Sequence, residues 1–345
     1  MGTPSYLAAG LVLSQGAAFS ALVEELQRDL RSLGYGTGPF DGIYGSGTTQ
    51  AVQALQFDLL NNTGASSAGD GNAPVAVQSY NSGRVTAVTG VVDQGTAAAI
   101  AAMLADPAFP RLPSSANPAS DNQAALAALG QLQGPAVPLP FLMAILEQES
   151  GCRHYHVPAA GDSDSYITAG MDRNDPAHPY AITSRGFGIG QYTLFHHPPT
   201  AAEVAGVIAD PVSNVSQTIA GLSDKFHHFV NGATADTQAA DRLAEAGAGP
   251  LRTCRYPTGD ARCMSDCAQC MSNAGVTNIV AGVTPLYAGC AETYAGTQYH
   301  GGSYKGVPVR ANLGCDWAYA VRRYNGSGVN SYDYQAEVLQ RMAAG

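Results

Sequence analysis

Residues 23–60 read VEELQRDLRSLGYGTGPFDGIYGSGTTQAVQALQFDLL, which is two apolar helical patterns with a turn between them. In the first pattern, apolar residues recur at steps of three and four, which places them on one helix face: Val23, Leu26, Leu30 and Leu33. Gly34 ends this helix, and Gly42 in the following turn can adopt a positive φ. A second helix is predicted to begin between Ser46 and Thr49, with this inner face: Val52, Leu55, Gln56 and Leu59.

A third helix is predicted after an insertion at residues 61–90 that is rich in Asn, Gly, Ser and Ala. Its inner face carries Ile100 and Leu104. An apolar residue, Asp, a short loop, Thr, and then Ala with a β-branched residue occur both at 40–52 and at 92–100. This is a weak internal repeat.

These N-terminal segments resemble a known module. LQRDLRSLGY at 26–35 and DGIYG at 41–45, followed by Thr49, Ala51-Val52 and Gln56, are similar to the three-helix peptidoglycan-binding module of many wall hydrolases. The resemblance covers about residues 11–105, although the 61–90 insertion departs from the usual short form. It implies a wall-binding surface at Asp41, Gly42 and Tyr44. The alternative is a helical packing domain with a glycine-rich turn.

The composition excludes several kinds of partner. Apolar residues make up 45% of the chain, charged residues 13%, and the formal net charge is −10. A chain this acidic, with no run of basic residues longer than Arg322-Arg323, is a poor candidate for binding nucleic acid or anionic lipid. No Lys or Arg precedes Arg28, so a secretory signal would lack its basic start, and residues 6–23 are too polar to span a membrane.

Residues 140–152 read PFLMAILEQESGC and contain the candidate catalytic acid. Helical spacing places Glu149 at the end of a face with Phe141 and Ile145, while Glu147 points roughly the opposite way. A carboxyl on a buried face loses water, so its pKa rises and it stays protonated near neutral pH, as glycoside cleavage requires. The plainer interpretation is a solvated Glu at a helix end.

Two later segments strengthen the catalytic interpretation. Residues 184–193 read SRGFGIGQYT, and its alternating glycines allow close approach of a ligand and leave N–H groups available for sugar hydroxyls. Residues 315–328 read CDWAYAVRRYNGSG, a helix that ends at Tyr324-Asn325 before a glycine stop. Tyr332 and Tyr334 lead into a final predicted helix at 334–343.

The three segments, in this order, resemble lysozyme-like lytic transglycosylases and goose-type lysozymes. The family motifs correspond to Glu149-Ser150, Gly188 to Gln191, and Ala320 to Gly326, over about residues 135–345. The resemblance implies that Glu149 is the acid/base, that Ser150 supports it and that Tyr324 orients it. It also implies these substrate-binding residues: Gly188, Gly190, Gln191, Tyr192, Tyr324 and Asn325.

Acidic residues between the first two motifs leave the product open. Goose-type lysozymes draw a water-positioning Asp from this region, and Asp162 or Asp172 could fill that role; Asp164 and Asp175 lie nearby. The plainer interpretation is a set of surface loop acids. We expect 1,6-anhydro products over reducing ends.

Six of the seven cysteines fall between Cys254 and Cys315 in a predicted insertion at about 250–315. They are compatible with three disulfides or with a structural zinc, and we expect disulfides. Cys152 could pair or stay free. No His-Glu-x-x-His signature is present, so the histidine pairs at 196–197 and 227–228 are interpreted as loop residues, and no catalytic metal or cofactor is expected.

The sequence therefore predicts a mainly α protein. It consists of a peptidoglycan-binding module (1–106), a Pro-, Ser- and Ala-rich linker (107–124) and a lysozyme-like domain (125–345). The expected function is cleavage of the β-1,4 bond between N-acetylmuramic acid and N-acetylglucosamine, and the alternative is a catalytically silent wall-binding protein. We expect it to act in the periplasm or at the cell wall without membrane insertion. A phage or a dedicated secretion system would deliver it, and a cognate immunity or inhibitor protein would be the partner of such an effector.

Overall fold

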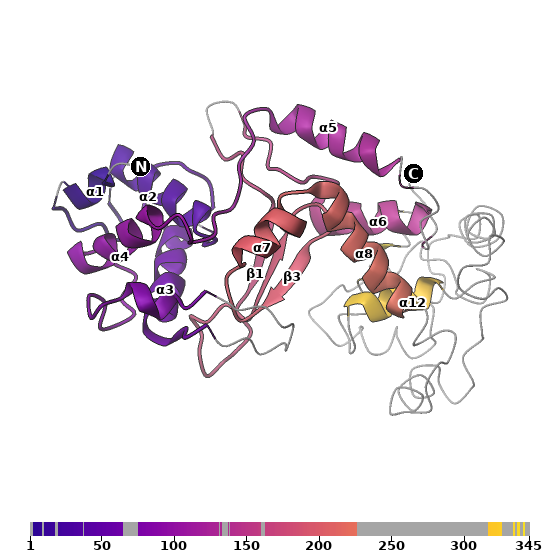
Figure 1. Ribbon diagram of the computed structural model, residues 1–345. Helices are drawn as coiled ribbons and strands as arrows, with labels where there is room; N and C mark the ends of the chain where they lie inside the picture. Colours follow the sequence, from indigo (N-terminus) through magenta and orange to yellow (C-terminus); the bar gives the residue numbers. More distant parts are fainter. Residues whose placement is uncertain are drawn as a thin grey trace. The chain divides into compact units, whose positions relative to one another are not determined.

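The computed structural model describes residues 3–8, 10–17, 20–36, 38–64, 75–130, 132, 137, 139–159, 163–225, 317–325, 334, 337–338 and 341 (Figure 1). The chain is mainly α. It forms two compact units, of which the first combines Met1–Ala128 with Arg153–Asn214 and the second combines Leu129–Cys152 with Val215–Gly345. The predicted cysteine-rich insertion, Asp162 and most of the predicted final helix lie outside the described residues.

The N-terminal part of the first unit is a bundle of helices. They are α1 (Ser5–Ala8), α2 (Ala21–Ser32), α3 (Ser46–Asn61), the 3-10 helix η1 (Val77–Tyr80) and α4 (Gln94–Ala105). The predicted inner faces are confirmed, because all ten of the apolar and glutamine positions named for them are buried. Side-chain caps fix two helix starts: the Ser20 hydroxyl accepts from the N–H of Leu22, and Asp93 accepts from the N–H of Thr96.

Two buried glutamines give the internal repeat a physical meaning. The Gln27 amide donates to the Ile43 carbonyl and the Thr48 hydroxyl and accepts from the N–H of Gly42. In the same way, the Gln56 amide donates to the Val91 carbonyl and the Thr96 hydroxyl and accepts from the N–H of Gly90. Both glycines have positive φ, +67° and +71°. The repeat therefore pairs Gly42 with Gly90, which corrects the predicted match of Asp41 to Asp93.

The rest of the first unit contains a three-stranded antiparallel sheet. The order is β1 (Ala169–Asp172), β2 (Ser184–Phe187), β3 (Tyr192–Phe195), followed by the short helix α7 (Ala201–Glu203) and the π-helix η2 (Val204–Ile208). Two buried ion pairs bind this region to the helical bundle: Arg31 with Asp164 at 2.7 Å, and Arg185 with Asp58 at 2.9 Å.

The predicted linker at 107–124 is packed within the first unit. Phe109 and Leu112 are buried, the N–H of Leu112 donates to the Ser32 carbonyl, and helix α5 (Pro118–Leu129) begins inside the predicted range. Residues 153–214 are also grouped with the helical bundle, a division that differs from the predicted boundaries. The buried ion pairs are the physical reason, since they join the two predicted domains.

Glu149 and Tyr324 lie on α6 (Leu139–Ser150) and α12 (Trp317–Asn325), and α8 (Pro211–Lys225) carries the residues that contact Tyr324. On α6 the predicted apolar face is confirmed, with Phe141, Ala144 and Ile145 buried. Among the described helices, none is long and apolar enough to cross a membrane.

Candidate active site

Glu149 lies in the last turn of α6 and is half-buried. Burial raises the pKa of its carboxyl above the ordinary value, and a hydrogen bond from Tyr334 opposes this rise. A carboxyl with a raised pKa retains its proton closer to neutral pH, which is the property that a general acid needs.

Among the residues that the structure describes, Tyr334 and not Tyr324 donates a hydrogen bond to the Glu149 carboxylate. The Tyr334 hydroxyl donates to Oε1 of Glu149 at 2.5 Å. Burial, followed by the charge of Glu149, raises the pKa of the Tyr334 hydroxyl well above its ordinary value, so it remains a donor at any working pH. Sequence reasoning assigned the orienting role to Tyr324 and treated Tyr334 only as the start of a helix. The signal in the sequence was that Tyr334 follows shortly after the Tyr-Asn-Gly motif.

Tyr324 lies near enough to Glu149 for the carboxylate charge to act on its hydroxyl. Burial and the charge of Glu149 raise the pKa of its hydroxyl to about 12, and that hydroxyl bonds with Thr218 of α8. Its ring lies against Gly221, where an added Cβ would be 3.3 Å from Cε2 of Tyr324. The absence of a side chain at Gly221 thus leaves room for the Tyr324 ring. Asn325 ends α12 and is exposed.

The neighbours of Glu149 on α6 have different surroundings. Glu147 is exposed, and its carboxylate lies 3.8 Å from the Arg341 guanidinium, as expected for the opposite helix face. The Ser150 hydroxyl donates to the Leu146 carbonyl one turn earlier at 3.1 Å, so this contact is made within its own helix. The predicted support of Glu149 by Ser150 remains a prediction.

The glycine turn at 188–191 joins β2 to β3, and its N–H groups are bonded within the protein. Gly188 donates to the Thr168 carbonyl at 2.8 Å, Ile189 to Nδ1 of His154 at 3.2 Å and Gly190 to Oδ1 of Asn214 at 2.7 Å. The expectation that Gly188 and Gly190 offer N–H groups to sugar hydroxyls is therefore wrong. Burial lowers the pKa of His154 to about 4, which keeps its ring neutral and able to accept.

The glycines of this turn are required by packing. Gly188 has a φ of +75°, and a Cβ there would lie 2.8 Å from Cε1 of His154. The Gln191 side chain donates to the Gly188 carbonyl at 2.8 Å and covers Gly186, where a Cβ would lie 2.6 Å from its Oε1. Tyr192 is half-buried against the apolar cluster of the sheet. Gln191 and Tyr192 thus stabilise the hairpin, and their predicted contact with substrate remains a prediction.

The described loop acids have partners of their own. Asp164 is buried in its ion pair with Arg31, and Asp175 is partly exposed, 3.0 Å from the ring of His178. Asp172 is exposed at the end of β1, and its Oδ2 accepts from the Ser184 hydroxyl at 2.9 Å. Asp162 lies outside the described residues.

The predicted wall-binding residues divide into buried and exposed ones. Tyr44 is fully buried, and its hydroxyl donates to the Gly90 carbonyl at 2.8 Å, while Gly42 is buried beside Gln27. Their predicted contact with the wall is therefore wrong, because both hold the two halves of the repeat together. Asp41 is exposed, and Ile43 next to it is 50% exposed, an apolar position that the sequence reasoning did not single out. A wall contact at this loop would involve these two side chains.

Within the described residues, no cluster of His, Cys, Asp and Glu could hold a metal ion. Cys152 is a free thiol in this part of the chain, and burial raises its pKa to about 11. The zinc and disulfide alternatives for the other six cysteines fall outside the described residues. His197 is buried and His196 is exposed, and both belong to a loop, as predicted.

Comparison with known families supports association with the cell wall. Residues 20–59 match the family described as "Putative peptidoglycan binding domain". The match covers α2, the turn and most of α3, and peptidoglycan is accordingly the partner that it indicates. No curated protein matches the chain.

Proposed function

We propose that this protein binds peptidoglycan through its N-terminal bundle and cleaves the glycan strands with Glu149 as the single acid/base. The observation that carries the proposal is the half-buried Glu149 carboxyl with a raised pKa, held by the Tyr334 hydroxyl. The family match at residues 20–59 supplies the polymer on which such an acid would act.

The reaction requires one proton to move twice. Glu149 donates its proton to the glycosidic oxygen as the bond from C1 of N-acetylmuramic acid to that oxygen breaks, which leaves a sugar with oxocarbenium character. The resulting carboxylate is stabilised by the Tyr334 hydroxyl. It then removes the proton from the C6 hydroxyl of the same sugar, whose oxygen bonds to C1 and closes a 1,6-anhydro ring. The free N-acetylglucosamine end keeps the first proton, and Glu149 regains one.

The surroundings of Glu149 favour this single-carboxylate mechanism over hydrolysis. In the described part of its own unit, Glu147 is exposed beside Arg341, Asp224 is exposed beside Lys225, and Glu337 bonds with Gln148. Each of these three carboxylates thus interacts with a neighbouring polar or charged side chain. A hydrolase would need a second group to hold water, and Asp162 and Asp172 are the residues to test for it.

The test compares two glutamates on one helix. Glu149→Gln should lower the rate of solubilisation of isolated cell walls by about 10²–10⁴-fold, since general acid catalysis contributes that much. Glu147→Gln is the matched control, two residues away and exposed, and should cleave as the parent does. Both variants should still sediment with insoluble peptidoglycan.

Two outcomes would contradict the proposal. Activity that survives in Glu149→Gln but is lost in Glu147→Gln would move the acid to the other face of α6. A parent protein that sediments with peptidoglycan and never solubilises it would favour the binding-only alternative, which the family match alone also supports.

A further inference from the structure

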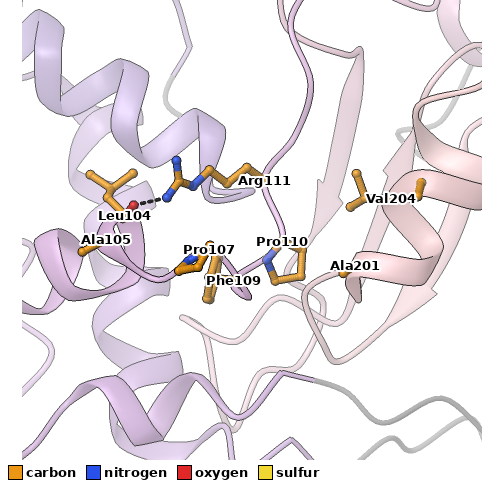
Figure 2. A pocket seen from close by; sticks show the side chains of 9 residues that line it. Leu104, Ala105, Pro107, Phe109, Pro110, Arg111, Ala201 and Val204 are labelled. Carbon is orange, nitrogen blue, oxygen red and sulfur yellow. Dashed lines mark hydrogen bonds between the residues drawn. The ribbon is translucent and has the colours of Figure 1, made fainter. Parts of the chain in front are cut away.

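A hollow of about 490 Å³ lies within the first unit, between the end of α4 and the α7–η2 segment. Leu104, Ala105 and the loop from Pro107 to Arg111 form one wall, and the other wall is made by Ala201, Val204 and Ala205. Figure 2 shows Ala201 and Val204 across the hollow from Leu104 and Arg111, with Pro107, Phe109 and Pro110 between them. Its size is within the range of about 300–1,000 Å³ that is typical of ligand sites.

Contacts made by residues outside the hollow stabilise both of its walls. Phe109 is buried and packs edge-on against Tyr80, with ring centroids 5.4 Å apart. On the other side, α7 begins with a capping box in which Thr200 and Glu203 bond each other's backbone. The next turn is the π-helix η2, a feature that frequently occurs at functional sites. The hollow is therefore preformed.

The side chains that line the hollow are apolar, except for one that carries a positive charge. Arg111 is the charged residue among those that line the hollow, and its guanidinium donates to the Leu104 carbonyl (Figure 2). The charge of Arg111 also acts on two carboxyls that do not line the hollow, those of Asp106 and Asp29, and the Asp106 carboxylate accepts from the Tyr80 hydroxyl at 2.7 Å and from the N–H of Ala108 at 2.8 Å. A ligand that fits has small apolar groups and a carboxylate.

We propose that this hollow binds the peptide stem of peptidoglycan, with alanine methyl groups against Ala201 and Ala205 and a carboxylate near Arg111. The inference rests on the proposed function, which makes peptidoglycan the polymer that this chain meets. A glycan is a poorer fit, because a sugar ring needs several hydrogen-bonding partners and the described lining consists of Leu, Ala, Pro, Phe, Val and Arg. Recognition of the stem would add a contact beyond the glycan strand.

The experiment measures binding of a synthetic stem pentapeptide, L-Ala-γ-D-Glu-L-Lys-D-Ala-D-Ala, to the full chain by calorimetry. Ala201→Trp and Ala205→Trp place an indole in the hollow from exposed helix positions. Because the indole occupies the space of the ligand, each variant should weaken binding at least about 10-fold, and a tenfold change corresponds to about 1.4 kcal/mol. Ala202→Trp is the matched control, because Ala202 is an exposed neighbour on α7 outside the lining, and it should bind as the parent does. Amidation of the terminal D-Ala should weaken binding to the parent.

Each outcome separates this inference from the proposed function. A pentapeptide that does not bind, or that binds all three variants equally, overturns the inference while cleavage of cell walls by the parent still supports the proposed function. Displacement of the pentapeptide by an N-acetylglucosamine oligomer also overturns it, because the hollow would then be a glycan site. A parent that neither binds nor cleaves cell walls defeats the proposed function whatever the pentapeptide does.

Discussion

The helical bundle and the Glu149 site differ in how completely their buried polar side chains are hydrogen-bonded. In the bundle, Gln27 and Gln56 are buried and bonded to several backbone groups, and Asp58 is buried in an ion pair. At the other site, Glu149 is held by one tyrosine hydroxyl, and its pKa is raised by burial. Fully bonded polar groups stabilise a fold, whereas a carboxyl with an unfavourable charge can give up or retain a proton during a reaction.

The largest expected effect on stability comes from breaking the ion pair between Asp58 and Arg185. Asp58→Asn leaves the guanidinium, 1% exposed, without its counter-charge and should lower the free energy of unfolding by about 3–5 kcal/mol. Chemical denaturation measures it. Asp175→Asn is the control, because its ion pair with His178 is exposed to solvent and should contribute little to stability.

Cleavage by Asp58→Asn, assayed where it is still folded, should match the parent. If Asp58→Asn and Asp175→Asn were equally stable, the buried ion pair between Asp58 and Arg185 would not stabilise the packing of the bundle against the sheet. That result would weaken the distinction between structural and chemical polar groups.

A smaller loss of stability is expected for the two glutamines of the repeat. Gln27→Ala and Gln56→Ala each leave buried N–H and carbonyl groups without partners, which should cost about 2–4 kcal/mol. Because the two glutamines make equivalent bonds, their losses should be similar. Gln50→Ala, at an exposed position on α3, should change stability by less than about 0.5 kcal/mol. A large loss for Gln27 alone would show that the repeat is not equivalent in energy.

The third prediction concerns pH and not stability. The Tyr334 hydroxyl bonds the Glu149 carboxylate and thereby lowers its pKa, so Tyr334→Phe should raise that pKa further. The active form of a general acid is protonated, and cleavage falls as the pH rises through the pKa. The alkaline limb of the pH–rate profile should therefore move to higher pH in Tyr334→Phe.

Tyr324→Phe provides the control for that shift, because the Tyr324 hydroxyl bonds Thr218 and not Glu149. Its alkaline limb should stay where the parent has it. An unchanged limb in Tyr334→Phe, or a larger shift in Tyr324→Phe, would return the orienting role to Tyr324.

The sequence predicted helices and their inner faces well because helical periodicity is a local signal. The apolar steps from Val23 to Leu33, and from Phe141 to Ile145, name the buried positions directly. The partners of polar groups are not local. The bonds of Gly190 to Asn214 and of Asp164 to Arg31 join residues that are 24 and 133 positions apart, and no spacing rule indicates them.

The candidate site was predicted in the same uneven way. Glu149 followed from the helix face on which it lies, and its burial and raised pKa agree with that reasoning. The choice between Tyr324 and Tyr334 depended on tertiary packing. The alternating glycines of the 188–191 turn were a misleading signal, because glycine is required wherever backbone meets any close neighbour, here His154 and Gln191.

The most direct test of the central claim is the mass spectrum of the fragments that the full chain releases from purified peptidoglycan. If Glu149 is a single acid/base, the fragments should end in 1,6-anhydro-N-acetylmuramic acid, which is one water lighter than a reducing end, and Glu149→Gln should release almost none. Reducing ends as the sole product, with release lost in Asp162→Asn or Asp172→Asn, would contradict the single-carboxylate mechanism and identify a hydrolase. Fragments released undiminished by Glu149→Gln would contradict the assignment of the acid itself.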